Sequence, residues 1–467
     1  MPRAPDRAKP ALRLDYCKGC GRCIGACAQG CIAPGKEIDA ASGFAPVALH
    51  LDACNSCDLC VDACPEPYGL VTAALARTLE AAAERRQLQM APPAVEDLPD
   101  VQAGLTESLP LIVKGTHASA IGALLGGCRH FFGYPITPST EGAELMAKLL
   151  PMLGGSFLQA VSEVAAVNMM YGCGAAGRRA MTFTSSPGFS LMLEGISYMI
   201  GAELPGVFVN VMRSGPGLGN IAPEQSDLKL VCRGLGHGST HALVLAPATP
   251  QEMLDFTMLA FDLSFRYRNP VVIVADGYLG QMTGKVVLPR AIVQPGLPAW
   301  AVSGDAAHRR NLVCSIELKE LDQEARTLRL LDKYARITEA EQRADLFCCE
   351  GAEVLFVACT TPARMAKGAV RALRAEGIAA GLFRPQTIWP FPVKQLLPLL
   401  ERTRRIVVVE ASEGQLEDEL RLALSHAGAP AGIEILHVRR LGGILPSQRE
   451  IVDAVRGRRS SRKVAAA

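Results

Sequence analysis

Short apolar runs alternate with longer segments of helical pattern through most of the chain. From Leu111 onward, runs rich in β-branched and aromatic residues predict strands at 129–134, 157–161, 180–184, 207–211, 242–246 and 271–275. Helical patterns lie between them, for example at 140–150 and 163–171. Apolar strands that alternate with helices are typical of a mostly parallel sheet covered on both faces. The pattern therefore predicts an α/β fold.

The alternation starts again after a charged connector. Residues 312–343 predict helix, and strands are expected after them at 354–358, 379–384, 406–410 and 433–438. Residues 70–89 are strong helix formers, and an acidic, proline-punctuated stretch follows them to Pro110. We expect five parts: a cysteine-rich domain at 1–75, a helix and linker at 76–110, an α/β domain at 111–295, a helical connector at 296–350 and a smaller α/β domain at 351–467.

Nine of the sixteen cysteines lie between Cys17 and Cys64. Eight of them form two runs of equal spacing, Cys17-x-x-Cys20-x-x-Cys23-x-x-x-Cys27 and Cys54-x-x-Cys57-x-x-Cys60-x-x-x-Cys64. Such tandem runs are the ligand pattern of a ferredoxin with two [4Fe–4S] clusters, in which the fourth cysteine of each run ligates the other cluster. The expected ligand sets are Cys17, Cys20, Cys23 and Cys64 for one cluster, and Cys54, Cys57, Cys60 and Cys27 for the other.

Zinc and disulfides explain these cysteines less well. Zinc sites usually take two pairs of ligands, often with histidine, and would leave the triplets unexplained. The N-terminus lacks the apolar core of a signal sequence, so we expect the reducing cytoplasm, where disulfides are rare. Two details separate the runs: Ala28 follows Cys27 where Pro65 follows Cys64, and an extra Cys31 lies four residues after Cys27. We expect Cys31 to be a small buried residue, and a ligand exchange is the alternative.

The net charge and hydropathy of the sequence indicate whether nucleic acid or a membrane is an expected partner. The formal net charge of +2 comes with no basic stripe that carries interleaved aromatic residues, so we expect no nucleic-acid partner. No apolar stretch reaches the length that crosses a bilayer, so we expect no membrane association. The hydrophobic fraction of 49% indicates a folded protein with a large core.

Two stretches resemble the glycine-rich fingerprint of a dinucleotide-binding site. Gly172-Cys-Gly174-Ala-Ala-Gly177 follows a predicted helix and precedes a predicted strand, which reverses the required order, so we expect helix termination and close packing there. Gly217-Leu-Gly219-Asn-Ile-Ala222 follows a strand, but no acidic residue lies at a suitable strand end about 20 residues further on. We therefore expect no nicotinamide cofactor.

Three stretches directly follow predicted strands, where open α/β sheets place their ligands. They are Gly133-Tyr-Pro-Ile-Thr-Pro-Ser139, Gln159-Ala-Val-Ser-Glu163-Val-Ala-Ala-Val-Asn168 and Asn210-Val-Met-Arg213-Ser-Gly-Pro-Gly-Leu-Gly-Asn220. Together with the cysteine runs, they resemble the 2-oxoacid:ferredoxin oxidoreductase family, and the resemblance continues through residues 185–189, 384–391 and 410–418. The run at 212–223 is most similar to the thiamine-pyrimidine subunit of the branched-chain (2-oxoisovalerate) enzymes, here with the ferredoxin fused in front of it.

The resemblance implies two transketolase-like parallel-sheet α/β domains preceded by an α+β ferredoxin domain of bacterial type. It implies decarboxylation of a 2-oxo acid on thiamine diphosphate with Mg²⁺, electron transfer to two [4Fe–4S] clusters and acyl transfer to coenzyme A. A ferredoxin or another acceptor takes the electrons, and a branched-chain acid is the expected substrate. Pyruvate, 2-oxoglutarate and an aryl 2-oxo acid such as phenylglyoxylate are alternatives within the class. A non-catalytic iron–sulfur electron-transfer subunit is the alternative outside it.

The same resemblance implies the site residues. Glu163 hydrogen-bonds the aminopyrimidine ring of the cofactor; a first-turn carboxylate favoured by the helix dipole is the alternative. Arg213 and Thr137 bind the substrate carboxylate through a charged fork and a hydroxyl; a surface ion pair and a rigid turn are their alternatives. The loop beside the cofactor is shaped by Gly215, Gly217 and Gly219.

One thiamine motif does not occur in the sequence. Thiamine enzymes hold the diphosphate through Mg²⁺ with a Gly-Asp-Gly motif followed at some distance by asparagine. Here Gly304-Asp305 is followed by alanine, and Asp276-Gly277 is preceded by alanine. We therefore expect a second, thiamine-diphosphate-binding (beta) subunit to complete the site. The resemblance also implies a gamma subunit and a dimer of such heteromers.

Overall fold

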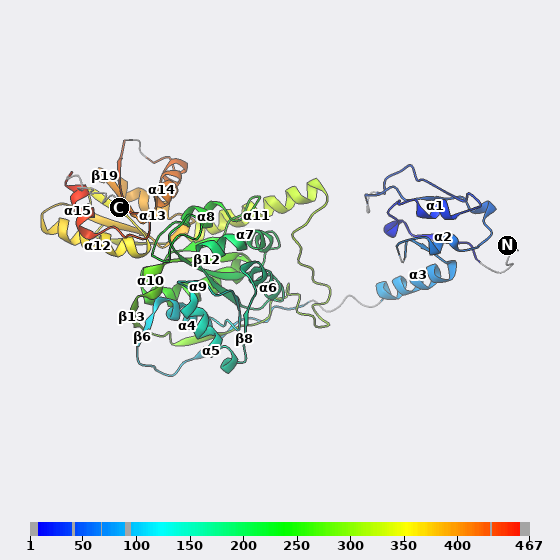
Figure 1. The fold of residues 1–467 in the computed structure, drawn as a ribbon, viewed down its shortest axis with the longest axis horizontal. Helices are drawn as coiled ribbons and strands as arrows, with labels where there is room; N and C mark the ends of the chain where they lie inside the picture. The colour runs from blue at the N-terminus through cyan, green and yellow to red at the C-terminus, as the bar shows by residue number, and fades with distance from the viewer. Residues whose placement is uncertain (1–7, 40–42, 67, 89–94, 430–431, 458–467) are drawn as a thin grey trace. The chain divides into compact units, whose positions relative to one another are not determined.

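The chain divides into two units, Met1–Ala94 and Val95–Ala467 (Figure 1). The computed structural model describes residues 8–39, 43–66, 68–88, 95–429 and 432–457. The linker expected at 76–110 is corrected at its C-terminal end, because residues from Val95 onward belong to the larger unit. There β5 (Val101–Gly104) pairs with β14 (Ala291–Gln294) in an antiparallel ribbon, which satisfies the backbone of this proline-flanked segment.

The smaller unit consists of short elements. Its strands form two antiparallel pairs: β1 (Ala11–Leu12) with β4 (Leu70–Val71), and β2 (Ile32–Ala33) with β3 (Ala48–Leu49). Two short helices, α1 (Arg22–Ala26) and α2 (Leu59–Asp62), pack on each other, each within one cysteine run. A longer helix, α3 (Ala73–Leu88), follows. It begins three residues later than predicted because Leu70 and Val71 are buried and pair with β1.

The larger unit contains a seven-stranded sheet in the order β18-β11-β12-β10-β9-β7-β8. Its strands are β7 (His130–Gly133), β8 (Ser156–Gln159), β9 (Ala180–Thr184), β10 (Gly206–Met212), β11 (Leu243–Leu245), β12 (Pro270–Asp276) and β18 (Thr387–Trp389). Neighbouring strands are parallel except β18, which runs antiparallel to β11. The six strands predicted between 129 and 275 are all present, and the mostly parallel sheet is confirmed.

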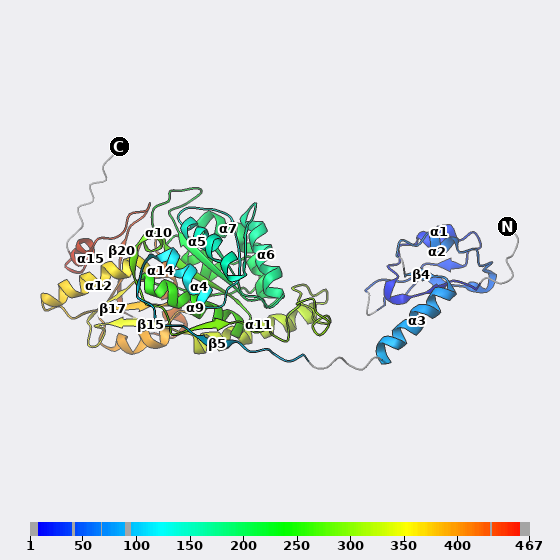
Figure 2. The ribbon, with the colours of Figure 1, turned by 90° about the horizontal axis from the view of Figure 1, so that it is seen from below.

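Helices cover this sheet (Figure 1 and Figure 2). They are α4 (Gly115–Leu125), α5 (Thr140–Leu149), α6 (Glu163–Ala175), α7 (Ser186–Gly201), α8 (Leu228–Arg233), α9 (Pro250–Tyr267) and α10 (Gly277–Gln281). Helix α4 packs along α9, and α6 packs along α7. Every residue of β9, β10 and β12 is buried, as strands between two helix layers must be. At the margin, β6 (Leu111–Lys114) pairs with β13 (Thr283–Val286) as an antiparallel ribbon.

A second sheet has the order β15-β17-β16-β19-β20. Its elements are β15 (Ala344–Phe347), β16 (Val354–Val357), β17 (Ala380–Pro385), β19 (Arg405–Glu410) and β20 (Glu434–Arg439), with helices α12 (Thr360–Ala375), α13 (Val393–Leu396), α14 (Gln415–His426) and α15 (Gln448–Val455). Two predicted boundaries need correction. Strand β15 lies inside the connector expected at 296–350, and β18 leaves the domain expected at 351–467 to join the first sheet. Both are short strands at sheet edges, and their partners are distant in the sequence.

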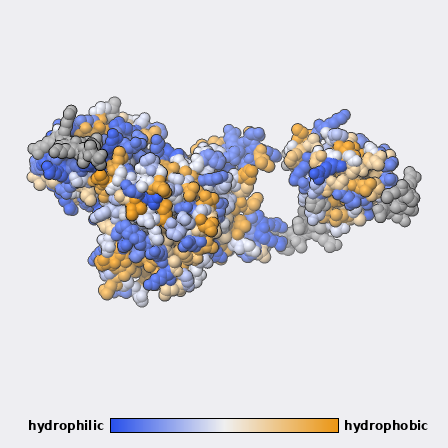
Figure 3. Space-filling view, in the orientation of Figure 1, coloured by the Kyte–Doolittle hydropathy of each residue, from blue (hydrophilic) through white to orange (hydrophobic). Residues whose placement is uncertain are grey.

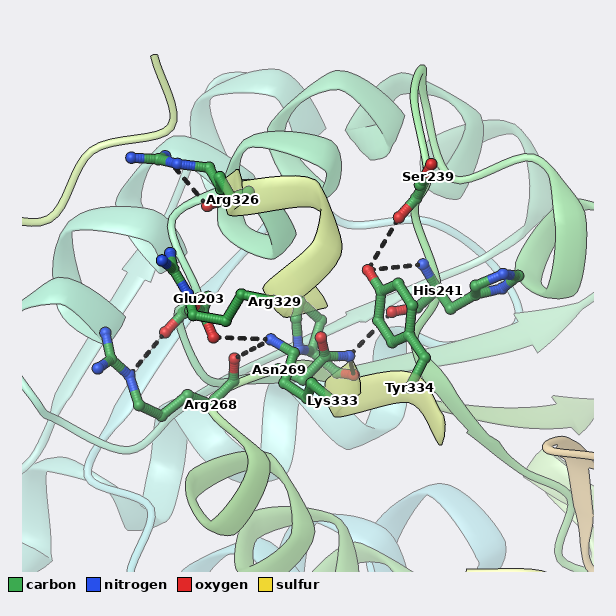
Figure 4. A network of polar contacts seen from close by, with 11 residues as sticks. Glu203, Ser239, His241, Arg268, Asn269, Arg326, Arg329, Lys333 and Tyr334 are labelled. Atoms are coloured by element: carbon green, nitrogen blue, oxygen red, sulfur yellow. Dashed lines mark hydrogen bonds and ion pairs between the residues drawn. The ribbon is translucent and has the colours of Figure 1, made fainter. Parts of the chain in front are cut away.

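The predicted connector contains one long helix, α11 (Glu320–Ala340), which polar contacts join to the body of the larger unit (Figure 4). Lys333 Nζ donates to Glu203 Oε2 at 3.3 Å and to the Arg268 carbonyl oxygen at 3.1 Å. Arg329 Nε donates to Glu203 Oε1 at 2.9 Å. The Lys333 side chain is only 3% exposed, and burial lowers its pKa to about 8.

One apolar core runs from the first sheet into the second, from Phe131 on β7 to Leu420 on α14. On the visible surface of each unit, apolar and polar residues are interspersed (Figure 3). Within the described ranges, no helix has both the length and the apolar character needed to span a bilayer.

Candidate functional site

The eight cysteines of the two runs lie around two pockets in the smaller unit. The first pocket is lined by Cys17, Cys20, Cys23 and Cys64. The second is lined by Cys54, Cys57, Cys60 and Cys27, and by Cys31 as well. Each pocket thus receives three cysteines from one run and the fourth from the other run. This is the grouping that the spacing predicts.

In each cysteine run, residues with a left-handed backbone conformation turn the chain around its pocket. They flank the second cysteine of both runs and have φ between 58° and 74°: Gly19, Gly21, Ser56 and Asp58. In such turns successive N–H groups point into a concavity that suits an anion. The Ser56 N–H donates to Cys54 Sγ at 3.4 Å, and the Cys31 N–H donates to Cys27 Sγ at 3.3 Å. Free thiols with N–H donors directed at their sulfur atoms fit [4Fe–4S] clusters.

The remaining predicted residues lie at one edge of the large sheet. Thr137 follows β7, Glu163 follows β8 and Arg213 follows β10. Because these strands are parallel, their carboxyl ends meet at the same edge, which is where open α/β sheets bind ligands. The topology therefore places all three residues on the ligand-binding side of the sheet.

Glu163 is the first residue of α6 and is only 4% exposed. The Ser162 hydroxyl caps this helix and fixes where Glu163 leaves the backbone. The carboxylate is directed at the start of α7, since a Cβ built on Gly188 would lie 2.4 Å from Glu163 Oε1 and 2.4 Å from Thr184 Oγ1. In the described part of the chain, the Thr184 hydroxyl and the adjacent Ser185 hydroxyl are buried without a hydrogen-bond partner. A buried carboxyl beside unpartnered hydroxyls fits a polar ring such as an aminopyrimidine.

Arg213 is buried, so the alternative of a surface ion pair does not hold. Its Nη1 donates to the Thr137 carbonyl oxygen at 2.8 Å and its Nη2 to the Leu218 carbonyl oxygen at 3.1 Å. Its Nε is buried and has no partner among the described residues. The structure thus brings Arg213 and Thr137 together through the Thr137 main chain, while the Thr137 residue itself remains exposed.

The three glycines after Arg213 are not equivalent. Gly217 and Gly219 have left-handed φ values of 71° and 53°. A Cβ on Gly219 would also lie 1.8 Å from the Ser214 carbonyl oxygen, so glycine is needed to close this loop. A Cβ on Gly215 would meet no atom within 4 Å, so space does not require glycine there.

A buried polar group behind this loop was not predicted from the sequence. Asp227 Oδ2 accepts from Ser186 Oγ at 2.5 Å and from Asn210 Nδ2 at 2.9 Å. Ser186 Oγ in turn accepts from the Arg213 N–H at 3.0 Å. Burial raises the pKa of Asp227. Ser186 follows a predicted strand and lies in the stretch 185–189 that resembles the family, but local pattern does not reveal the burial of Asp227.

Asp227 and Ser186 also line a pocket of about 480 Å³ that lies beside the glycine loop. Two more carboxyl groups, from Glu224 and Glu413, contribute to its wall. No lysine or arginine lines it among the described residues. The pocket therefore does not favour a ligand group of negative charge.

Several apolar side chains close to Glu163 in the sequence, and one on α7, are exposed. Val161 is 89% exposed, and exposures between 41% and 54% are found for Leu158, Val164 and Leu191. These residues belong to β8, α6, α7 and the turn before Glu163. Exposed apolar side chains that gather on one part of a surface are typical of a site that binds a ligand or another chain.

Comparisons with known protein families agree with all three parts of the chain. Residues 16–67 match the family described as "4Fe-4S dicluster domain". Residues 121–314 match "Pyruvate flavodoxin/ferredoxin oxidoreductase, thiamine diP-bdg", and residues 352–451 match "Pyruvate:ferredoxin oxidoreductase core domain II". The thiamine-binding match includes both Glu163 and Arg213.

Individual proteins are similar over long stretches. The ketoisovalerate oxidoreductase subunit VorB of Methanothermobacter thermautotrophicus is 45% identical over 347 residues, which cover 74% of this chain and 97% of that protein. The 2-oxoglutarate synthase subunit KorA of Archaeoglobus fulgidus is 37% identical over 316 residues, which cover 66% of this chain and 90% of that protein. The solved 2-oxoglutarate:ferredoxin oxidoreductase from Magnetococcus marinus has a TM-score of 0.68 at 24% identity, covering 82% of this chain and 70% of that chain. This likeness confirms the α/β fold class.

Proposed function

Since this chain belongs to the thiamine diphosphate-dependent 2-oxoacid:ferredoxin oxidoreductase family, we propose that Glu163 holds the aminopyrimidine half of thiamine diphosphate. The chain is a subunit of such an oxidoreductase and carries an iron–sulfur domain. When bound, thiamine diphosphate supplies the carbanion chemistry that decarboxylates 2-oxo acids. Glu163 would hold the aminopyrimidine ring through a hydrogen bond from its carboxyl group. The burial of its carboxyl beside free hydroxyls is the observation that carries this assignment.

Arg213 and Thr137 bind the carboxylate of the 2-oxo acid. Two carbonyl oxygens and Ser186 fix the Arg213 backbone and guanidinium in place, which keeps a permanent positive charge beside the exposed Thr137. A preformed guanidinium binds a carboxylate without the cost of ordering a flexible side chain. Gly217 and Gly219 let the loop turn tightly enough for the Leu218 carbonyl to reach Arg213.

A partner subunit completes the thiamine site. The sequence contains no Gly-Asp-Gly motif for Mg²⁺ and diphosphate, so these groups are held by the second subunit. The exposed apolar residues around Glu163 form the surface on which that subunit lies. Glu163 then faces a site shared by two chains. A gamma subunit and a dimer of heteromers belong to the same proposal.

Electrons leave through the smaller unit. We assign one [4Fe–4S] cluster to the pocket of Cys17, Cys20, Cys23 and Cys64 and the other to the pocket of Cys54, Cys57, Cys60 and Cys27. The acceptor is a ferredoxin or another electron carrier, and coenzyme A takes the acyl group.

The substrate is a branched-chain 2-oxo acid. The VorB relative, named for ketoisovalerate, is more similar to this chain than the KorA relative, named for 2-oxoglutarate. Among the described residues, three carboxyl groups and no basic residue line the pocket beside the glycine loop, which disfavours the second carboxylate of 2-oxoglutarate.

The experiment is an anaerobic assay of the chain purified with its partner subunits. Viologen reduction is followed with 2-oxoisovalerate, pyruvate, 2-oxoglutarate and phenylglyoxylate, each with and without coenzyme A. Reduction by 2-oxoisovalerate that depends on coenzyme A is expected. Preference for another acid refutes the substrate assignment. Failure of every acid, while dithionite still reduces the clusters, favours a pure electron-transfer subunit.

A pair of variants tests the residue that carries the proposal. Glu163→Ala should lower turnover at least about 100-fold at unchanged iron content, because one positioned hydrogen-bonding group contributes on that scale. Glu194→Ala makes the same change at an exposed position on α7 and should keep turnover. Equal turnover in both variants would remove Glu163 from the site.

A further inference from the structure

We propose that Cys31 is a reserve ligand of the second cluster site, able to take the place of Cys27 on the iron. The inference rests on the proposed ligand sets and extends them. Five thiols line the second pocket, whereas four line the first. A [4Fe–4S] cluster needs four cysteine ligands, so the second pocket holds one thiol more than its cluster uses.

Cys31 lies within this group of thiols. It is 2% exposed and packs in the same buried cluster as Cys27, Cys54 and Cys60. Its own N–H donates to Cys27 Sγ at 3.3 Å, so the two residues share one corner of the pocket. Cys31 therefore lies where the fourth ligand of the second cluster arrives.

The chain between the two cysteines can adjust. Ala28 and Gly30 are exposed, and Gly30 has a left-handed φ of 62° with no atom within 4 Å of the place of a Cβ. No proline fixes the residue after Cys27, in contrast to Pro65 after Cys64. Four residues after Cys64 the chain has Tyr68 in place of a thiol. Cys64 thus corresponds to Cys27 in the other run, but it has no additional cysteine four residues after it.

The exchange involves no net oxidation or reduction. The bond between Cys27 Sγ and iron breaks, and the Cys27 thiolate takes up a proton. The Cys31 thiol loses a proton as its sulfur binds the same iron. One proton moves between two neighbouring cysteines, and the charge of the cluster with its four thiolates is unchanged.

The test compares alanine variants in the full chain with its partners. Alanine is used because a serine oxygen could itself ligate iron. The variants are Cys27→Ala, Cys31→Ala, Cys64→Ala and the double variant Cys27→Ala with Cys31→Ala. Iron and acid-labile sulfide per chain are measured together with the electron paramagnetic resonance spectrum of the dithionite-reduced protein.

Cys27→Ala and Cys31→Ala should each keep about eight iron atoms per chain, the content of two [4Fe–4S] clusters. Cys64→Ala and the double variant should each fall to about half of that content. Loss of iron in Cys27→Ala to the level of the double variant would overturn the proposal, as would loss in Cys31→Ala alone. Full iron content in Cys64→Ala would instead show that the ligand sets themselves are wrong, so the two failures are distinguishable.

Discussion

Gly188 offers a way to move the Glu163 carboxylate without changing Glu163. A Cβ at Gly188 would lie 2.4 Å from Glu163 Oε1 and 2.4 Å from Thr184 Oγ1, whereas ordinary contact begins at 3.4 Å. In Gly188→Ala the carboxylate oxygen must therefore move by about 1 Å. A misplacement of about 1 Å in a catalytic group costs roughly 100-fold in rate. We expect kcat/KM to fall by about that factor, which corresponds to about 2.7 kcal/mol of transition-state stabilisation.

Anaerobic viologen reduction at saturating thiamine diphosphate measures this effect. The fold should persist, because both clashing atoms belong to side chains and not to the backbone, and alanine favours helix over glycine by about 1 kcal/mol. Gly172→Ala is the matched control, since it lies in α6 with no atom within 4 Å of the place of a Cβ. If Gly188→Ala keeps kcat/KM within about threefold of the control at equal iron content, the carboxylate does not need its observed position, and the reasoning is refuted.

Three further predictions concern the loop, the partner surface and α11. Gly219→Ala should raise the KM for the 2-oxo acid about 10-fold, because a Cβ 1.8 Å from the Ser214 carbonyl oxygen forces the loop open. Gly215→Ala is the control, and a KM of Gly219→Ala equal to that of the control contradicts the prediction. Val161→Lys should prevent copurification of the partner subunit at an unchanged melting temperature of the chain, since Val161 is 89% exposed and contributes to the apolar surface. The pKa of Lys333 is about 8 in the folded protein and 10.5 when the side chain is free of the fold. Between pH 8 and pH 10.5 the folded state therefore binds fewer protons than the unfolded state, so the free energy of unfolding must rise with pH in this range. The free energy of unfolding of the wild type relative to Lys333→Met should therefore increase by up to about 3 kcal/mol from pH 7 to pH 11 in denaturant titrations, and a flat difference refutes the assignment.

The central strands could be predicted because strands that are buried on both faces are short continuous apolar runs in the sequence. Strand β9 was placed residue for residue, and β10 and β12 differ from prediction by one residue at each end. The glycine pattern at 172–177 ends α6, and a Cβ on Gly174 would lie 2.6 Å from the Pro205 carbonyl oxygen, as expected for close packing. The short strands β15 and β18 were missed because they pair with segments distant in sequence. Edge pairing leaves no periodic apolar signal.

Some features of the site could also be predicted from the sequence, and others could not. Glu163 and Arg213 could be named because the stretches that contain them resemble the family and follow strands whose ends were predicted to within two residues. The contact between Asp227 and Ser186 could not be named, since it joins residues 41 positions apart through a carboxyl whose burial depends on tertiary packing. The fourth cysteine of each run was an exception, because the ligand rule of tandem ferredoxins supplies a long-range contact that local pattern lacks. Both groups of thiols could therefore be predicted from spacing alone.

The contrast between Val161 and Glu163 supports the proposal that a partner subunit completes the thiamine site. Two residues apart, the apolar side chain is 89% exposed and the carboxyl side chain is buried. A complete site would cover Val161, because burial of such a side chain stabilises by about 1.5 to 3 kcal/mol. A large apolar core packs against β9 and β10, so we expect the chain to fold without the partner. We propose that cofactor binding does require the partner, because the sequence contains no Gly-Asp-Gly motif for the diphosphate and Mg²⁺. The isolated chain should therefore fold with both clusters and bind thiamine diphosphate only weakly, until a partner covers the surface around Glu163.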